Sequence, residues 1–270
     1  NKLDMDFLDQ GEITVKNIAQ PVHVYFVNMA EVGPSGVAQA GADPQPTAFP
    51  GKPSVAVLPF SNMSNDPEQE YFSDGITEDI ITDLSKVSGL SVLSRNTVFT
   101  LKGKALNLQQ AARQLGVAFV VEGSVRKAGN RVRITAQLIE GATDRHLWAD
   151  RYDRDLTDIF AVQDEITQTI VSQLKVQLLP EEQEAISQPP TENVEAYTLY
   201  LKGREFFRRS TKPNLQLARQ MFARAIELDP LYARAYAGLA DCDSFLFLHY
   251  SEGVSIDDIL ANCVKALSID

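Results

Sequence analysis

The stretch from Ser54 to Leu84 constrains the fold more than any other part of the chain, because an apolar run is followed there by a loop and an amphipathic segment. The run from Val55 to Leu58 is too short for a helix and is rich in β-branched residues, which predicts a strand buried on both faces. Pro59 marks its end. Strands of this kind are typical of a sheet that helices cover.

The segment after this strand predicts a polar loop over 61–70 and then a helix. Asp74 lies where it would cap that helix, and Glu78 and Asp79 then fall near its start, where acidic side chains favour the helix dipole. This position explains the two carboxylates better than an acid–base pair does. The apolar face of the helix comprises Ile76, Ile80, Ile81, Leu84 and Val87.

The later segments predict how the sheet continues. Asn107 and Gly116 carry the residue types that begin and end a helix, and alternating residues after Gly116 predict a half-exposed hairpin. The expected elements are strands over 90–93, 118–126, 131–140 and 145–152, and helices over 107–115 and about 158–179. Their order predicts an α/β domain with a mixed sheet over 54–180, with parallel crossovers first and an antiparallel meander after.

Four segments of this region also show a family resemblance. VAVLPFSNMS, YFSDGITEDIITDLS, EGSVRKAGNRVRITAQLIE and HLWADRYDRDL resemble the TolB-like amino-terminal domain that is found in bacterial multidomain signalling proteins. The resemblance implies the same α/β fold. It does not imply an activity, because one fold hosts many functions.

The amino-terminal residues 1–30 predict a β-hairpin, and a second resemblance lies within it. G-E-x-x-x-K-N-I-x-x-P-V-x-V-Y-x-V is similar to the closing strands of class III adenylate and guanylate cyclase catalytic domains. By this resemblance Lys16 would contact the nucleotide phosphates, although a solvated lysine at a strand end is an equal alternative. The metal-binding aspartates and the Asn/Arg pair of that family lie upstream of these strands, and so before Asn1.

We therefore expect no catalytic and no metal-binding residue in this chain, and no cyclase activity from the chain alone. The resemblance implies a parent protein that needs Mg or Mn ions with ATP and that pairs as a homodimer. Because a cyclase uses intracellular ATP, it also implies a cytoplasmic location. The chain begins and stops within recognisable patterns, so we interpret it as a piece of a longer protein.

Composition limits the partners. Lys and Arg number 25 against 36 Asp and Glu, and the net charge of -11 disfavours binding to nucleic acid or to anionic membranes. No apolar run approaches the ~20 residues of a membrane span.

Residues 31–53 and 181–193 are rich in Pro, Gly or acidic residues, which predicts two linkers. Cys242 and Cys263 match no zinc or redox spacing and are interpreted as free thiols on helices, with a disulfide as the alternative.

Residues 194–270 are purely helical in pattern and resemble tetratricopeptide repeats. The spacing A-x3-F-x2-A-x4-P is formed by Ala218, Phe222, Ala225 and Pro230, and RAIELD at 224–229 recurs as KALSID at 265–270. We expect an insertion between Ser244 and Ser255 and an array that continues after Asp270. An all-α repeat region of this kind implies a concave surface that binds a protein or peptide partner.

Two further groups were weighed as sites. Arg126, Lys127, Arg131 and Arg133 of the hairpin suit an anion, but a solvated strand face is the stronger alternative. The three histidines are scattered and match no metal-binding spacing. The sequence thus favours a non-catalytic regulatory and protein-interaction region of a multidomain class III adenylate cyclase. The alternative is a pure interaction scaffold with a degenerate cyclase-like domain.

Overall fold

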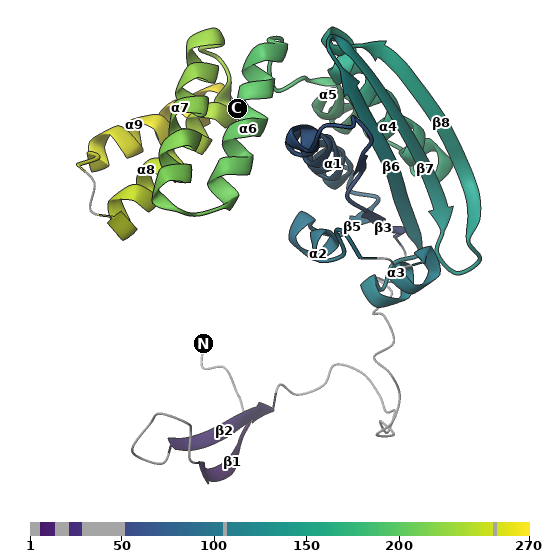
Figure 1. Cartoon of the computed structure of the whole chain (residues 1–270). Coiled ribbons are helices and arrows are strands. Elements are labelled where there is room, and N and C mark those ends of the chain that lie inside the picture. The colour runs from purple at the N-terminus through teal and green to yellow at the C-terminus, as the bar shows by residue number, and fades with distance from the viewer. Residues whose placement is uncertain (1–5, 14–21, 29–51, 105–106, 251–252) are drawn as a thin grey trace. The chain divides into compact units, whose positions relative to one another are not determined.

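The computed structural model describes residues 6–13, 22–28, 52–104, 107–250 and 253–270. The chain divides into two compact units, Asn1–Gln45 and Pro46–Asp270. The first unit contains an antiparallel pair, β1 (Asp6–Ile13) and β2 (Val22–Asn28), whose register shifts between Asp9 and Glu12 (Figure 1). The two strands expected in this region are therefore present, whereas Lys16 lies outside the described residues.

A six-stranded sheet forms the centre of the α/β part of the second unit (Figure 1). Its strands are β3 (Ser54–Val57), β4 (Ser61–Asn62), β5 (Ser91–Val92), β6 (Phe119–Ala128), β7 (Arg131–Glu140) and β8 (Arg145–Asp155). The order is β5-β3-β6-β7-β8, with β4 beside β6. β3 runs parallel to β5 and β6, while β6, β7 and β8 form an antiparallel meander. The predicted mixed sheet is confirmed.

Helices α1 (Glu70–Ser85) and α4 (Ile159–Gln173) cover one face of this sheet (Figure 1). All four residues of β3 are buried, as the apolar run predicted. In β7, buried residues alternate with more exposed ones over 131–138, because only the face toward α1 and α4 is covered. The interpretation of a half-exposed hairpin is therefore confirmed. The elements α2 (Arg95–Phe99), α3 (Leu108–Leu115), η1 (Pro67–Gln69) and η2 (Leu156–Asp158) complete this part.

The predicted start of the first helix is wrong. α1 begins at Glu70 rather than after Asp74, because the carboxylate of Asp66 accepts a hydrogen bond from the Glu68 amide at 2.9 Å and caps η1, which leads directly into α1. Asp74 is instead buried in the second turn and bound to the Lys102 ammonium at 2.5 Å. The cap of α3 was predicted correctly, since Asn107 accepts from the Gln110 amide and Gly116 ends the helix with φ +70°.

The end of α4 also differs from the prediction. The helix stops at Gln173, because Lys175 adopts a positive φ of 56° and turns the chain. Residues 181–193, expected to be a linker, contain most of helix α5 (Pro180–Ser187), in which Glu182 and Ile186 are buried. The Glu182 carboxylate accepts from the Ser88 amide at 2.8 Å, so this connection is packed against the end of α1.

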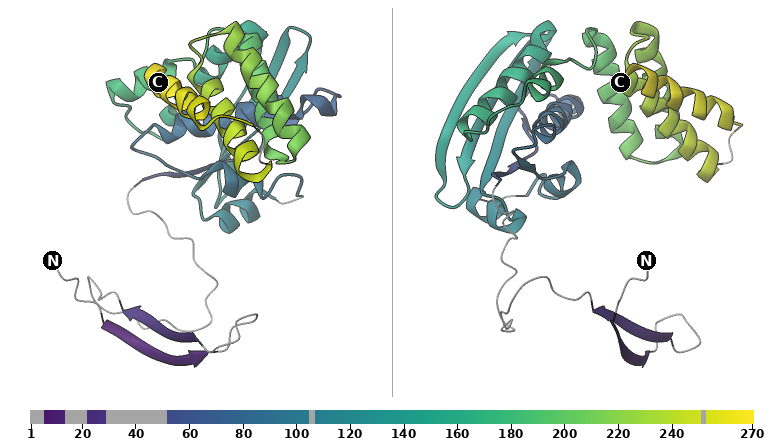
Figure 2. Two further views of the ribbon diagram at one scale, coloured as in Figure 1. Left: turned by 90° about the vertical axis from the view of Figure 1, so that its left-hand side faces the viewer. Right: turned by 180° about the vertical axis from the view of Figure 1, so that it is seen from behind.

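Four helices follow, and each packs on the next (Figure 2). They are α6 (Val194–Arg208), α7 (Lys212–Leu228), α8 (Ala233–Tyr250) and α9 (Ile256–Ile269). Phe222 of α7 is fully buried between two glycines, Gly203 of α6 and Gly238 of α8, and a Cβ atom at either glycine would lie 2.7 Å from its ring. α8 continues through most of the segment in which we expected an insertion.

Candidate functional site

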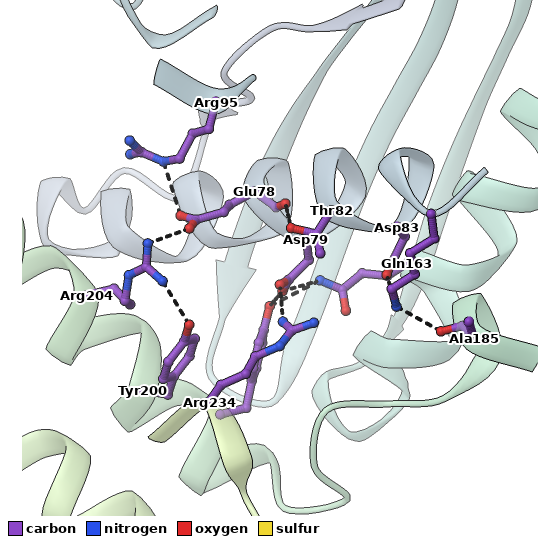
Figure 3. A network of polar contacts seen from close by, with 12 residues as sticks. Glu78, Asp79, Thr82, Asp83, Arg95, Gln163, Ala185, Tyr200, Arg204 and Arg234 are labelled. Atoms are coloured by element: carbon purple, nitrogen blue, oxygen red, sulfur yellow. Dashed lines mark hydrogen bonds and ion pairs between the residues drawn. The ribbon is translucent and has the colours of Figure 1, made fainter. Parts of the chain in front are cut away.

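The contact between α1 and the carboxyl-terminal helices is the most elaborate polar site among the described residues. Its centre is the adjacent pair Glu78 and Asp79, in the third turn of α1, where their side chains point toward α6 and α8 (Figure 3). We call the following residues the interdomain network: Glu78, Asp79, Arg95, Gln163, Tyr197, Arg204, Arg208 and Arg234.

Glu78 is shared by three arginines, two of which, Arg95 and Arg204, are drawn in Figure 3. Arg204 of α6 donates to Oε1 at 2.7 Å, and Arg208 of the same helix donates to Oε2. The Nε of Arg95, from α2, lies 3.1 Å from Oε2, while its guanidinium stacks 3.8 Å from the centre of the Phe99 ring. One carboxylate thus links α2 and α6 to the middle of α1.

Asp79 lies deeper and is 7% exposed. Its Oδ1 accepts from Arg234 of α8 at 2.9 Å, and its Oδ2 accepts from Gln163 of α4 at 3.0 Å and from the Tyr197 hydroxyl of α6. Gln163 also lies 3.1 Å from the Tyr197 oxygen. A single side chain therefore connects α1 with three other helices, two of which belong to the carboxyl-terminal group.

The ionisation behaviour of these residues follows from burial and from their partners. Burial raises the pKa of Tyr197 well above its ordinary value, and the Asp79 carboxylate adds to the rise, so the hydroxyl stays a donor. Burial alone would lower the pKa of Arg234, but Asp79 and the neighbouring tyrosines more than offset this and raise it. Burial, and then repulsion from Arg208, lowers the pKa of Arg95. The Tyr197 hydroxyl and the Arg234 guanidinium therefore both donate to the Asp79 carboxylate.

An apolar contact lies beside these charges, where the Leu201 side chain of α6 packs on Gly75 of α1. A Cβ atom on Gly75 would lie 2.5 Å from the methyl groups of Leu201, so a larger residue here would force the Leu201 side chain to move. A cavity of about 300 Å³ remains next to the contact. Its lining includes Tyr200, Arg204, Arg234 and Asp241.

The structure assigns other roles to the residues that were weighed as sites. Arg131 and Arg133 both bind Asp153, which holds the pKa of that carboxyl at about 2, and Arg126 donates to the Met63 carbonyl. The ammonium of Lys127 lies 4.8 Å from the centre of the Phe72 ring. The hairpin cations are thus engaged with the α/β part itself. The thiols of Cys242 and Cys263 are free.

Within the described ranges, no group of three His, Cys, Asp or Glu side chains is arranged to hold a metal ion. No described helix is both long and apolar enough to cross a bilayer.

Sequence reasoning missed the interdomain network. Glu78 and Asp79 were interpreted as charges at a helix start, which is wrong because α1 begins at Glu70. The partners of these carboxylates lie as many as 155 positions away, so no local pattern indicates them. The only available signal was that Arg204 and Arg208 lie one turn apart on one face of their helix.

Comparison with known proteins gives two sequence matches. Residues 51–169 match the family described as HilA/YgeH-like transcriptional regulator, second domain. A curated relative from Rhizobium meliloti (strain 1021), named "Putative adenylate cyclase 3", is 48% identical over 260 residues, which are 96% of this chain and 44% of the relative. The chain therefore spans less than half the length of that relative.

Solved structures show a weaker likeness. TolB from Acinetobacter baumannii is 19% identical with a TM-score of 0.36, and the match covers 46% of this chain and 28% of TolB. Lipoprotein GNA1162 from Neisseria meningitidis is 17% identical with a TM-score of 0.35, covering 44% of this chain and 99% of the lipoprotein. The carboxyl-terminal domain of LpoB from Escherichia coli is 17% identical with a TM-score of 0.32, covering 38% and 82%. These TM-scores are too low to support an argument.

Proposed function

We propose that this chain is a non-catalytic regulatory and protein-interaction region of a larger class III adenylate cyclase, a protein that converts ATP to cyclic AMP. The observation on which the proposal rests is the 48% identity with the Rhizobium meliloti protein over 96% of this chain. The similarity to a domain of a transcriptional regulator supports a regulatory role. Similar domains would then belong both to a regulator of transcription and to an adenylate cyclase.

The proposed domain plan has three parts. Residues 1–30 are the closing strands of the cyclase domain, 54–180 are a TolB-like domain, and 194–270 are tetratricopeptide repeats. The repeat assignment is supported by the complete burial of Phe222 against two glycines, one from each of the helices that flank α7.

The non-catalytic character is supported by the way the polar residues are used. The two carboxylates at the centre of the site have fixed partners: Glu78 is bound by arginines, and Asp79 by several donors at once. Groups with so many fixed partners hold two parts of a protein together, whereas a general acid or base needs access to a substrate. We therefore assign Glu78 and Asp79 a structural role, in which they hold the α/β domain and the helices α6–α9 together.

The longer protein would need Mg or Mn ions with ATP, and Lys16 would contact the nucleotide phosphates. Because a cyclase uses intracellular ATP, we place the longer protein in the cytoplasm, and because class III sites form between two cyclase domains, we propose that it is a homodimer. A regulatory region then acts by changing how the cyclase domains pair, which requires a different affinity for the paired and unpaired states. The repeat helices would bind a protein or peptide partner.

The test compares the longer protein with a version that ends near Val32. Specific activity is measured over a range of protein concentrations, with and without cell extract. We expect the two forms to differ in their concentration dependence. Equal activity, equal concentration dependence and the same co-purifying proteins would refute the regulatory role. The scaffold alternative predicts that neither form makes cyclic AMP.

A further inference from the structure

We propose that the face of α6 and α8 that meets α1 is a recognition surface for helices with two adjacent acidic residues, and that α1 is its built-in occupant. The inference rests on the proposed function, because it specifies the partner through which regulation would act. A partner helix of the same chemistry would compete with α1 and separate the repeat helices from the α/β domain.

The surface is formed by the first helix of each helical pair. α7 packs against α6 and α8 from the other side, through Phe222. The face that α7 leaves open presents Tyr197, Arg204 and Arg208 from α6, and Arg234 from α8, all of which bind α1. The concave surface that we expected to be open for a peptide is thus partly filled from within the chain.

The chemistry of the occupant follows from what α1 supplies. Glu78 and Asp79 are neighbours in sequence, and they meet arginines of different helices, since the first meets Arg204 of α6 and the second meets Arg234 of α8. Gly75, three positions earlier, allows the close approach of Leu201. A competing helix therefore needs a small residue followed by acidic residues three and four positions later, which is the Gly-x-x-Glu-Asp pattern of α1.

Charge complementarity supports this choice of partner. The chain has a net charge of -11, but three arginines of α6 and α8 converge on this face. Their side chains keep partial access to water, at 35% for Arg204, 23% for Arg208 and 27% for Arg234. A solvated guanidinium tolerates separation from its partner better than a fully buried one does. The contact is therefore suited to exchange between an internal and an external acidic helix.

Opening the contact does not require α1 to leave its own domain. Ile76, Ile80 and Leu84 are fully buried and keep α1 on the sheet. What separates is α6–α9 as a group. An external helix binds only the open form, so its apparent affinity is reduced by the fraction of molecules that are open.

The test uses the whole chain and an alanine-rich helical peptide with Gly-Ala-Ala-Glu-Asp at its centre, followed by fluorescence anisotropy. The chain variant E78Q/D79N removes the charges of the internal occupant. It should bind the peptide at least about tenfold more tightly than the wild type does, because more molecules are open. The variant E181Q/E184Q, which changes two exposed acids of α5, is the matched control and should behave as the wild type. A Gln-Asn peptide should bind to none of them.

A charge reversal on the receiving face gives an independent variant. R204E/R208E should lose the Glu-Asp peptide and gain a Gly-Ala-Ala-Lys-Asp peptide, because Arg234 still meets the second position. Circular dichroism checks that each variant is folded. The wild type is also titrated to high peptide concentration, so that weak binding by its open fraction is detected. Equal binding by the wild type and E78Q/D79N would overturn the inference, as would no preference for the acidic peptide in the wild type or any folded variant. If that happens while truncation near Val32 still alters cyclase activity, the proposed function stands and only the partner assignment fails.

Discussion

Replacing Asp79 with Ala tests whether the α/β domain and the repeat helices behave as one cooperative unit. The carboxylate accepts hydrogen bonds from Arg234, Gln163 and Tyr197, and the change leaves all three donors without it. Removing one partner of a buried ion pair lowers the free energy of unfolding by about 3–5 kcal/mol. Because the Arg234 side chain is 27% exposed, water can partly replace the carboxylate, and we expect the lower end, about 3 kcal/mol.

Two spectroscopic probes separate the parts in a urea titration. The chain has a single tryptophan, Trp148 in β8, so fluorescence reports the α/β domain, whereas far-ultraviolet circular dichroism reports mainly the helices. In the wild type we expect the two transitions to coincide. In D79A the helical signal should change at lower urea than the fluorescence, because the link to α6 and α8 is lost.

The matched control is Glu227→Ala, which breaks the pair of Arg224 and Glu227 on the surface of α7, with side chains 57% and 62% exposed. Exposed pairs contribute about 0–1 kcal/mol, so both transitions should stay where they are. If D79A costs less than about 1 kcal/mol, or if its two transitions still coincide, the network does not couple the two parts.

Three further predictions concern packing, pH and the connection between the parts. Gly238→Val should destabilise the helical region by about 1–3 kcal/mol in urea unfolding, because its Cβ would meet the Phe222 ring at 2.7 Å, while Gly253→Val, with no neighbour within 4 Å, should be neutral. Burial, and then repulsion from Asp83, raises the pKa of Asp164 to about 6, so the native state holds this proton more tightly than the unfolded chain, and stability is lost as pH rises through 6. Asp164→Asn should therefore add about 1 kcal/mol at pH 7, after allowance for partial exposure, and progressively less toward pH 4, as thermal unfolding at both pH values will show. Limited proteolysis should spare residues 181–193, since Glu182 and Ile186 are buried, and early cleavage there would contradict the packed connection.

Local signals were sufficient wherever the cause of a structure is local. The cap at Asn107 and the stop at Gly116 depend on residues within one turn, and the alternation in β7 reflects a sheet covered on one face. The start of α1 was misplaced because two acids compete as caps, and Asp66, followed by a proline at the first position of η1, takes that role rather than Asp74. The connection over 181–193 was misinterpreted because its proline and acidic residues are typical of linkers, while its burial depends on the distant end of α1.

The interdomain network shows why the total charge of a chain does not predict where its polar sites lie. A net charge of -11 disfavours a polyanionic partner at long range, but it averages over a chain whose arginines are not evenly spread. Arg95, Arg204 and Arg208 meet at one carboxylate whose partners are separated from it by as many as 130 positions in sequence. A contact that combines these charges with apolar side chains such as Leu201 exposes polar as well as apolar surface when its two faces part. This property suits a joint that opens to admit an acidic helix, whereas a purely apolar contact would favour permanent closure.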